Sequence, residues 1–305
     1  MDVYKKELFL KNIVAKYNTT NKYKRVSLSP IRYPGGKSLG VGYVVEKLPE
    51  HITSIVSPFF GGGSIEIALN KYLDISVKGF DIFDILTNYW QFQITNSVDL
   101  YNKLSELSPD QKTFNEVRGK LNAHWKGSLK LNSLDLATYY FYNFSLSYGP
   151  SFLGWASKIY LNEIRYKSLL NKVKDFSVNN FTVNCMSFEK VLKKYPNEFL
   201  YLDPPYYIGE GSKMFKGIYP MRNSPIHHKG FNHELLHDML LKHKGGFILS
   251  YNNCDTVREW YKDFDQSFPV WQYTMGQGET RIGKNRIADN INHIKDSHEI
   301  LICSE

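Results

Sequence analysis

The fold follows most directly from FLYLDPPYY at residues 199–207, an apolar run that ends in a carboxylate, two prolines and two tyrosines. The run predicts a short buried strand, which ends at Pro204 because proline donates no ladder hydrogen bond. Asp203 would then follow the carboxyl end of a strand, where open α/β sheets bind their ligands. The stiff turn would direct the Asp203 carboxylate and the Pro204 carbonyl as paired acceptors beside the ring of Tyr206. This arrangement suits a planar base with an exocyclic amino group, and an edge turn with a capping aspartate is the alternative.

The composition is that of a globular protein with a substantial core: 305 residues, of which 42% are hydrophobic and 22% are charged. The formal net charge of +8 is compatible with a polyanionic partner. The cysteines are widely spaced, which argues against a disulfide framework and a zinc site and favours a reducing compartment. No apolar run approaches the roughly 20 residues of a membrane span, and the N-terminus lacks a signal-peptide pattern. We therefore expect a cytoplasmic protein without a membrane segment or a bound metal.

A first glycine turn lies in IRYPGGKS at residues 31–38. Its Gly-Lys-Ser ending suggests a phosphate-binding loop, but Ile31 stands where that motif requires a glycine, so we reject a nucleoside triphosphate site. What remains is a tight turn that brings backbone close to a ligand, with Tyr33 and Lys37 beside it.

A second glycine turn, GGGS at residues 61–64, joins the apolar strand predicted within residues 51–60 to a helix. Strand, glycine turn and helix form a nucleotide-binding unit of α/β proteins. Glu66 replaces the last glycine of the dinucleotide fingerprint, which disfavours a dinucleotide dehydrogenase. The next predicted strand ends in Asp81, about twenty residues after the turn, where a carboxylate accepts ribose hydroxyls in such units. Asp81 could instead cap a helix, but Asp84 is the better candidate for that cap.

In order and approximate spacing, these pieces resemble the Dam-type DNA adenine N6-methyltransferases, in the arrangement in which the cofactor motifs precede the Asp-Pro-Pro-Tyr motif. The matching segments are residues 32–37, 58–64, 80–82, 203–206 and the C-terminal strand 298–302. The resemblance is weakest over residues 1–28 and 90–180. It implies a Rossmann-like α/β fold with a mixed sheet, S-adenosylmethionine as the cofactor and double-stranded DNA as the partner.

The resemblance also implies a domain organisation. Residues 1–28 form an N-terminal extension, residues 29–84 and 181–305 form the catalytic domain, and residues 85–180 form an inserted, mostly helical target-recognition domain. Within the insert, helical spacing predicts helices over residues 88–107, 108–125 and 134–144. Oligomeric state is expected to be a monomer or a weak dimer.

Cofactor and catalytic residues follow from the same resemblance. Catalysis is expected from Asp203, Pro204, Pro205 and Tyr206. Contacts with the cofactor are expected from Tyr33, Pro34, Gly35, Gly36, Lys37, Pro58, Phe59, Phe60, Gly61, Gly62, Gly63, Ser64, Asp81, Ile82, Ser187, Phe188 and Asp203. The resemblance places Ser187 and Phe188 over the cofactor adenine, and an ordinary turn at these residues is equally open.

Two segments are expected to contact DNA. The first is the aromatic loop or hairpin of residues 145–155, which follows the family's asparagine position; its candidate residues are Asn143, Tyr148, Phe152 and Trp155. It lacks the basic, glycine-rich continuation usual in the family, and base wedging and plain packing are both open. The second is a basic loop whose candidates are Arg281, Lys284 and Arg286, with solvated charge as the alternative. Residues 208–230 are expected to form a lid over DNA, and the adjacent histidines 227–228 are not expected to bind metal.

The expected reaction is transfer of a methyl group to N6 of an adenine flipped out of double-stranded DNA at a specific site. Hydrogen bonds to Asp203 and to the Pro204 carbonyl would stabilise the positive charge that develops on a poorly nucleophilic amine. A base inside a duplex cannot reach this geometry, so the adenine must be extruded and held by stacking on Tyr206. N4-cytosine methylation and a catalytically idle DNA-binding module are the alternatives. The target sequence and a role in restriction–modification cannot be read from the residues.

Overall fold

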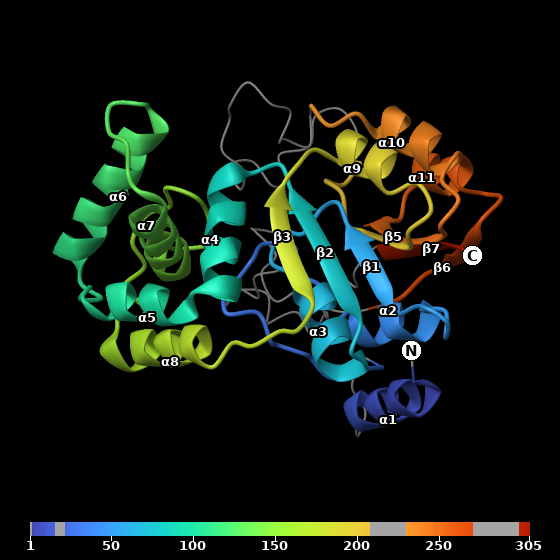
Figure 1. Cartoon of the computed structure of the whole chain (residues 1–305), viewed down its shortest axis with the longest axis horizontal. Helices are drawn as coiled ribbons and strands as arrows, with labels where there is room; N and C mark the ends of the chain where they lie inside the picture. Colours follow the sequence, from blue (N-terminus) through green and yellow to red (C-terminus); the bar gives the residue numbers. More distant parts are fainter. Residues whose placement is uncertain (1, 16–21, 208–229, 271–298) are drawn as a thin grey trace, which may run out of the picture.

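The computed structural model describes residues 2–15, 22–207, 230–270 and 299–305, and these residues build a mixed seven-stranded sheet flanked by helices (Figure 1). The strand order is β3-β2-β1-β4-β5-β7-β6. The strands are β1 (Ser54–Ser57), β2 (Ser76–Asp81), β3 (Phe181–Cys185), β4 (Leu200–Leu202), β5 (Phe247–Asn252), β6 (Asp265–Ser267) and β7 (Glu299–Ser304). Strands β1 to β5 pair in parallel, and β7 runs antiparallel to both β5 and β6. This confirms the predicted α/β class and its mixed sheet.

Side chains of the central strands are buried on both faces of the sheet, which explains their continuous apolar runs. In β4, Leu200 and Leu202 pack in one core cluster and Tyr201 packs in the other, because successive side chains of a strand point to opposite faces. Buried residues of α2 (Val41–Lys47) and α3 (Ser64–Leu73) belong to the Tyr201 cluster. Those of α9 (Phe188–Lys194), α10 (His233–Leu240) and α11 (Asp255–Trp260) belong to the opposite cluster.

The N-terminal extension contains a helix, α1 (Val3–Ile13), as its lysine-rich pattern predicts. Asp2 caps it by accepting a hydrogen bond from the backbone of Tyr4. The helix packs against α2 and α3, and Phe9 is its buried residue.

Between β2 and β3 the chain forms the predicted helical insert, which lies beside the β3 edge of the sheet (Figure 1). Its helices are α4 (Asp84–Thr95), α5 (Ser97–Ser105), α6 (Gln111–Trp125), α7 (Ser133–Leu146) and α8 (Glu163–Lys174). The single helix expected over residues 88–107 is two helices that break at Asn96, and the sequence reading did not identify α8. Helix α4 packs against both β3 and α7, so the insert shares its aromatic core with the sheet. Its boundaries as a separate domain remain a prediction.

Helix caps provide a finer test of the sequence reading. Asn232 caps α10, accepting a hydrogen bond from the backbone of Leu235 at 2.9 Å. Asp84 was expected to cap α4 but is the first residue of that helix. Asp81 instead binds the backbone N–H of Phe83, which occupies the cap position.

Candidate active site

A pocket opens at the carboxyl ends of β1, β2 and β4, where the motifs were expected to meet. Its lining contains every predicted catalytic and cofactor residue except Ser187. Six lining residues were not predicted: Ile65, Glu66, Glu189, Tyr201, Phe231 and Asn232. The pocket is therefore built from segments that are far apart in the sequence.

The two glycine turns form one wall of the pocket because they pack directly against each other. A Cβ added to Gly62 would lie 2.4 Å from the Cβ of Tyr33, so no larger residue fits there without displacing the first turn. Gly63 has a φ of 64°, a conformation that glycine adopts without strain, and it leads into α3. Backbone is thus exposed to a ligand along this wall.

Asp81 fixes the second turn at the end of β2. Its Oδ2 accepts a hydrogen bond from the backbone of Gly61 at 2.9 Å, and its Oδ1 accepts one from Phe83 at 2.9 Å. Burial raises the pKa of Asp81, although these backbone hydrogen bonds oppose the shift. Because each carboxylate oxygen can accept a second hydrogen bond, Asp81 retains acceptor capacity toward a hydroxyl in the pocket.

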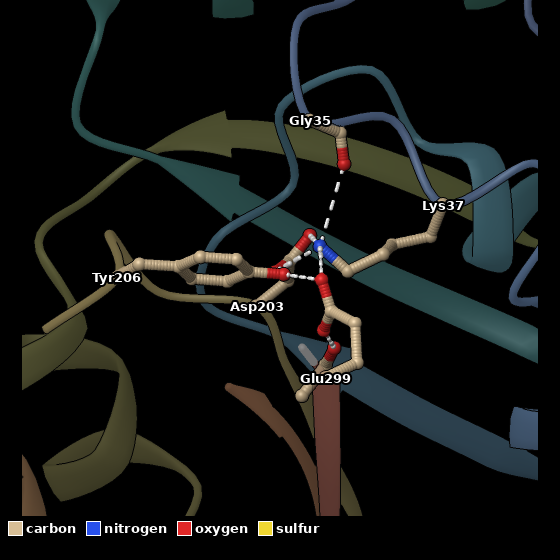
Figure 2. Close-up of polar contacts among 6 residues, drawn as sticks. Gly35, Lys37, Asp203, Tyr206 and Glu299 are labelled. Carbon is tan, nitrogen blue, oxygen red and sulfur yellow. Dashed lines mark hydrogen bonds and ion pairs between the residues drawn. The ribbon is translucent and has the colours of Figure 1, made fainter. Parts of the chain in front are cut away.

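Asp203 follows β4, and the ammonium of Lys37 is its principal partner (Figure 2). The Lys37 Nζ lies 2.8 Å from Oδ1 and 3.0 Å from Oδ2 of Asp203, and it donates to the carbonyl of Gly35 at 3.3 Å. Burial raises the pKa of Asp203, and the charge of Lys37 opposes that shift. Lys37 thus links the first glycine turn to the Asp-Pro-Pro-Tyr segment and favours the ionised carboxylate.

A second carboxylate, Glu299, completes this network and was not predicted (Figure 2). Its Oε1 accepts a hydrogen bond from the Tyr206 hydroxyl, its Oε2 accepts one from Ser250 at 3.1 Å, and the Lys37 Nζ lies 4.0 Å away. The side chain is 1% exposed. The sequence offers one sign of this role: Glu299 stands beside the apolar run of a predicted buried strand, and an acid buried there requires polar partners.

A third acid, Glu66, lies in the first turn of α3 and lines the pocket. It accepts a hydrogen bond from Ser57 at 2.6 Å, and burial raises the pKa of Glu66 to about 8. The neighbouring hydroxyl of Tyr201 is buried and has no hydrogen-bond partner among the described residues. From the sequence, Glu66 was interpreted only as the residue that replaces the last glycine of the dinucleotide fingerprint.

Two of the four residues of the insert that were expected to contact DNA are buried, and two are exposed. Asn143 and Phe152, which we expected to contact DNA, lie in the interior at 1% and 9% exposure. Phe152 packs against aromatic rings of the insert core, and Asn143 donates to Gly154, so both support the hairpin from within. This corrects their assignment as DNA contacts.

The other two residues of the hairpin point outward, at 56% exposure for Tyr148 and 73% for Trp155. Their backbones are joined by a 2.8 Å hydrogen bond, and the guanidinium of Arg118 lies 4.0 Å from the centre of the Trp155 ring. The candidates Arg281, Lys284 and Arg286 lie outside the described part of the chain, as do residues 208–229 of the lid expected over residues 208–230. Within the described ranges, no cluster of His, Cys, Asp and Glu is placed to hold a metal, and no helix is suited to span a membrane.

An open, mostly parallel sheet with glycine turns at its carboxyl edge defines a Rossmann-like α/β protein, and the same pocket holds the acid–proline corner formed by Asp203, Pro204 and Pro205. The chain belongs to the D12 class N6 adenine-specific DNA methyltransferase family, whose model matches residues 33–276. It is also similar to modification methylase StsI of Streptococcus sanguinis, with 25% identity over 209 residues. That alignment covers 64% of this chain and 30% of the relative, so the chain spans about a third of its length.

Proposed function

We propose that this protein transfers a methyl group from S-adenosylmethionine to N6 of an adenine in double-stranded DNA at a specific sequence. The observation that supports this most strongly is the position of Asp203 and Tyr206 in the same pocket as both glycine turns. A methyl donor and an acceptor base would meet there. Membership of an adenine-specific family favours adenine over the N4 amine of cytosine.

The chemistry of the groups that line the pocket supports the proposed cofactor. Backbone exposed at the glycine turns can approach the methionine portion, and Asp81 can accept the ribose hydroxyls. Three aromatic rings contact one another in the lining and offer apolar faces to the cofactor adenine: Phe59, Phe188 and Phe231, with centroids 5.2 to 5.6 Å apart. The sulfonium, when bound, supplies a methyl group that is already activated for transfer.

Asp203 has two tasks in this proposal. Its carboxylate accepts a hydrogen bond from the substrate amine, and it stabilises the positive charge that develops as the amine attacks. The carbonyl of Pro204 accepts from the second N–H of that amine. Lys37 maintains Asp203 in its ionised form, because an ammonium at 2.8 Å favours the charged carboxylate.

Tyr206 provides the face on which the extruded adenine stacks. The ring of Tyr206 stacks on the ring of Tyr251, with the two ring centroids 6.3 Å apart and an interplanar angle of 27°. Tyr148 and Trp155 are the proposed DNA contacts of the insert, since a base or sugar can pack on their exposed rings. A monomer or weak dimer and a cytoplasmic location remain predictions.

The test is to incubate the protein with labelled S-adenosylmethionine and a duplex of random sequence, and then to digest the DNA to nucleosides. N6-methyladenine in the digest supports the proposal, and mapping its positions gives the target sequence. N4-methylcytosine would assign the protein to the other amine class. DNA binding with neither methyl transfer nor cofactor binding by calorimetry would support the catalytically idle DNA-binding module.

Asp203→Ala provides the mechanistic control. We expect it to abolish transfer, because the amine loses its charged acceptor, while the protein stays folded. Turnover close to that of the wild type in this variant would contradict the proposed role of Asp203.

A further inference from the structure

We propose that Glu299 is a positioning residue for methyl transfer: it orients the ring of Tyr206 and shares the ammonium of Lys37 with Asp203. Glu299 would thereby control how strongly Asp203 accepts a hydrogen bond from the substrate amine. The proposal rests on the proposed function and deepens it.

The carboxylate of Glu299 is held rigidly at the start of β7 (Figure 2). This residue pairs with Asn252 of β5 in the antiparallel register, which places its side chain beneath the acid–proline corner. Ser250 and Tyr206 each donate to one of its oxygens. Because both oxygens have partners and the side chain is 1% exposed, the carboxylate has little freedom to reorient.

Tyr206 is consequently fixed at both ends. Its backbone follows Pro204 and Pro205, which restrict φ, and its hydroxyl is bound to Glu299. The plane of the ring, which would carry the substrate base, is then set by a residue 93 positions further along the chain. Loss of the hydroxyl contact would leave the ring in place but free to tilt.

Lys37 connects the two carboxylates. Its Nζ lies 2.8 Å from Asp203 and 4.0 Å from Glu299, so one ammonium lies within ion-pair distance of two acids (Figure 2). When Glu299 is ionised, it draws part of the ammonium's interaction away from Asp203. When Glu299 is protonated, Asp203 holds the ammonium alone and becomes a weaker acceptor for the substrate amine.

This arrangement makes the reaction sensitive to pH near neutrality. Burial raises the pKa of Glu299 to about 7, opposed first by the charge of Lys37. Within the described part of the chain, the other groups that face Glu299 include Asp203 and Tyr206 after β4, Tyr201 within β4 and Ser250 on β5. Because the ionised form is the effective one, kcat should rise as the pH increases through about 7.

Glu299→Gln tests the charge while retaining the size and an oxygen that can accept from Tyr206. We expect kcat to fall about tenfold to hundredfold, since small errors in alignment have effects of this order. The Michaelis constant for the cofactor should stay unchanged, and the rise in kcat near neutral pH should disappear or move to lower pH. Asp265→Asn is the matched control, because it removes a carboxylate that pairs with Lys47 at 2.8 Å outside the pocket.

Tyr206→Phe is the second variant and keeps the proposal testable if Glu299→Gln fails to fold. It removes the anchored hydroxyl and should lower kcat while the rise near neutral pH persists, because Lys37 and Glu299 are both retained. A purely structural role for Glu299 would instead lower the melting temperature, with no shift in the pH profile. Wild-type kcat and an unshifted profile in Glu299→Gln would overturn the proposal. A wild-type protein that methylates no DNA would overturn the proposed function itself.

Discussion

The ionisation of Glu66, which lines the pocket, can be followed through the free energy of unfolding at different pH values. Its side chain is 2% exposed, and burial raises the pKa of Glu66 from 4.5 to about 8. An acid whose pKa is raised by folding binds its proton more tightly in the folded state than in the unfolded state. The stability that this proton contributes is complete below pH 4.5 and is lost as the pH rises to about 8.

Glu66→Gln removes this titration but retains the acceptor for the Ser57 hydroxyl. Between the two pKa values, each pH unit changes the contribution by about 1.4 kcal/mol. Relative to the wild type, the variant should therefore gain about 2–3 kcal/mol of unfolding free energy between about pH 6 and about pH 8. For a chain of 305 residues this corresponds to about 4 °C in Tm.

Urea unfolding followed by tryptophan fluorescence at the two pH values measures this difference. Glu259→Gln serves as the control, because it removes the charge of a glutamate on α11 that is largely exposed and pairs with Lys262. This control removes the same charge from the surface and leaves the buried Glu66 in place. If the stability difference between Glu66→Gln and the wild type is the same at both pH values, Glu66 is not protonated in the folded protein and the reasoning fails.

Three further changes test other parts of the site. Lys37→Met should raise the pKa of Asp203 further, so that methyl transfer falls at least about tenfold at neutral pH and partly recovers at higher pH in a pH–rate profile. Gly62→Ala should cost about 1–3 kcal/mol in urea unfolding and weaken cofactor binding in calorimetry, because the added Cβ meets Tyr33 at 2.4 Å. Trp155→Ala should change stability by less than about 0.5 kcal/mol, since the ring is 73% exposed, but weaken DNA binding by about 1–3 kcal/mol in a fluorescence titration. Unchanged pH dependence, unchanged cofactor affinity and unchanged DNA affinity, respectively, would contradict these expectations.

The sequence predicted best those features that have a local steric cause. Proline cannot continue a central strand, so the end of β4 and the position of Asp203 followed from two residues. Glycines at 61–63 could be placed after a strand because such turns need backbone without a Cβ. These local constraints located the pocket, since the carboxyl ends of parallel strands meet at one edge of the sheet.

Features that depend on packing between distant segments were missed or misassigned. Glu299 acts across the sheet on residues that precede it by more than 90 positions, and nothing in its immediate neighbours indicates Tyr206 as its partner. Asn143 and Phe152 were expected to face DNA, but an aromatic hairpin gives no local sign of which side it buries. In the structure, the hairpin buries the side chain of Phe152 and exposes that of Trp155.

The distribution of charge explains why one pocket suits both proposed substrates. Among its described lining residues, Lys37 supplies the cationic side chain, while Glu66, Asp81, Glu189 and Asp203 supply carboxyl groups, with Glu299 close to Lys37 and Asp203. A sulfonium cofactor brings a positive charge, and an amine gains one as it attacks, so an acid-rich pocket stabilises both states. Full ionisation of buried acids without these ligands would be costly, and the raised pKa of Glu66, about 8, allows this lining residue to be protonated instead. Binding of a cationic cofactor should then release protons, and calorimetry in buffers of different ionisation enthalpy at neutral pH would detect that release. A binding enthalpy independent of the buffer would show that Glu66 does not change protonation when the pocket is filled.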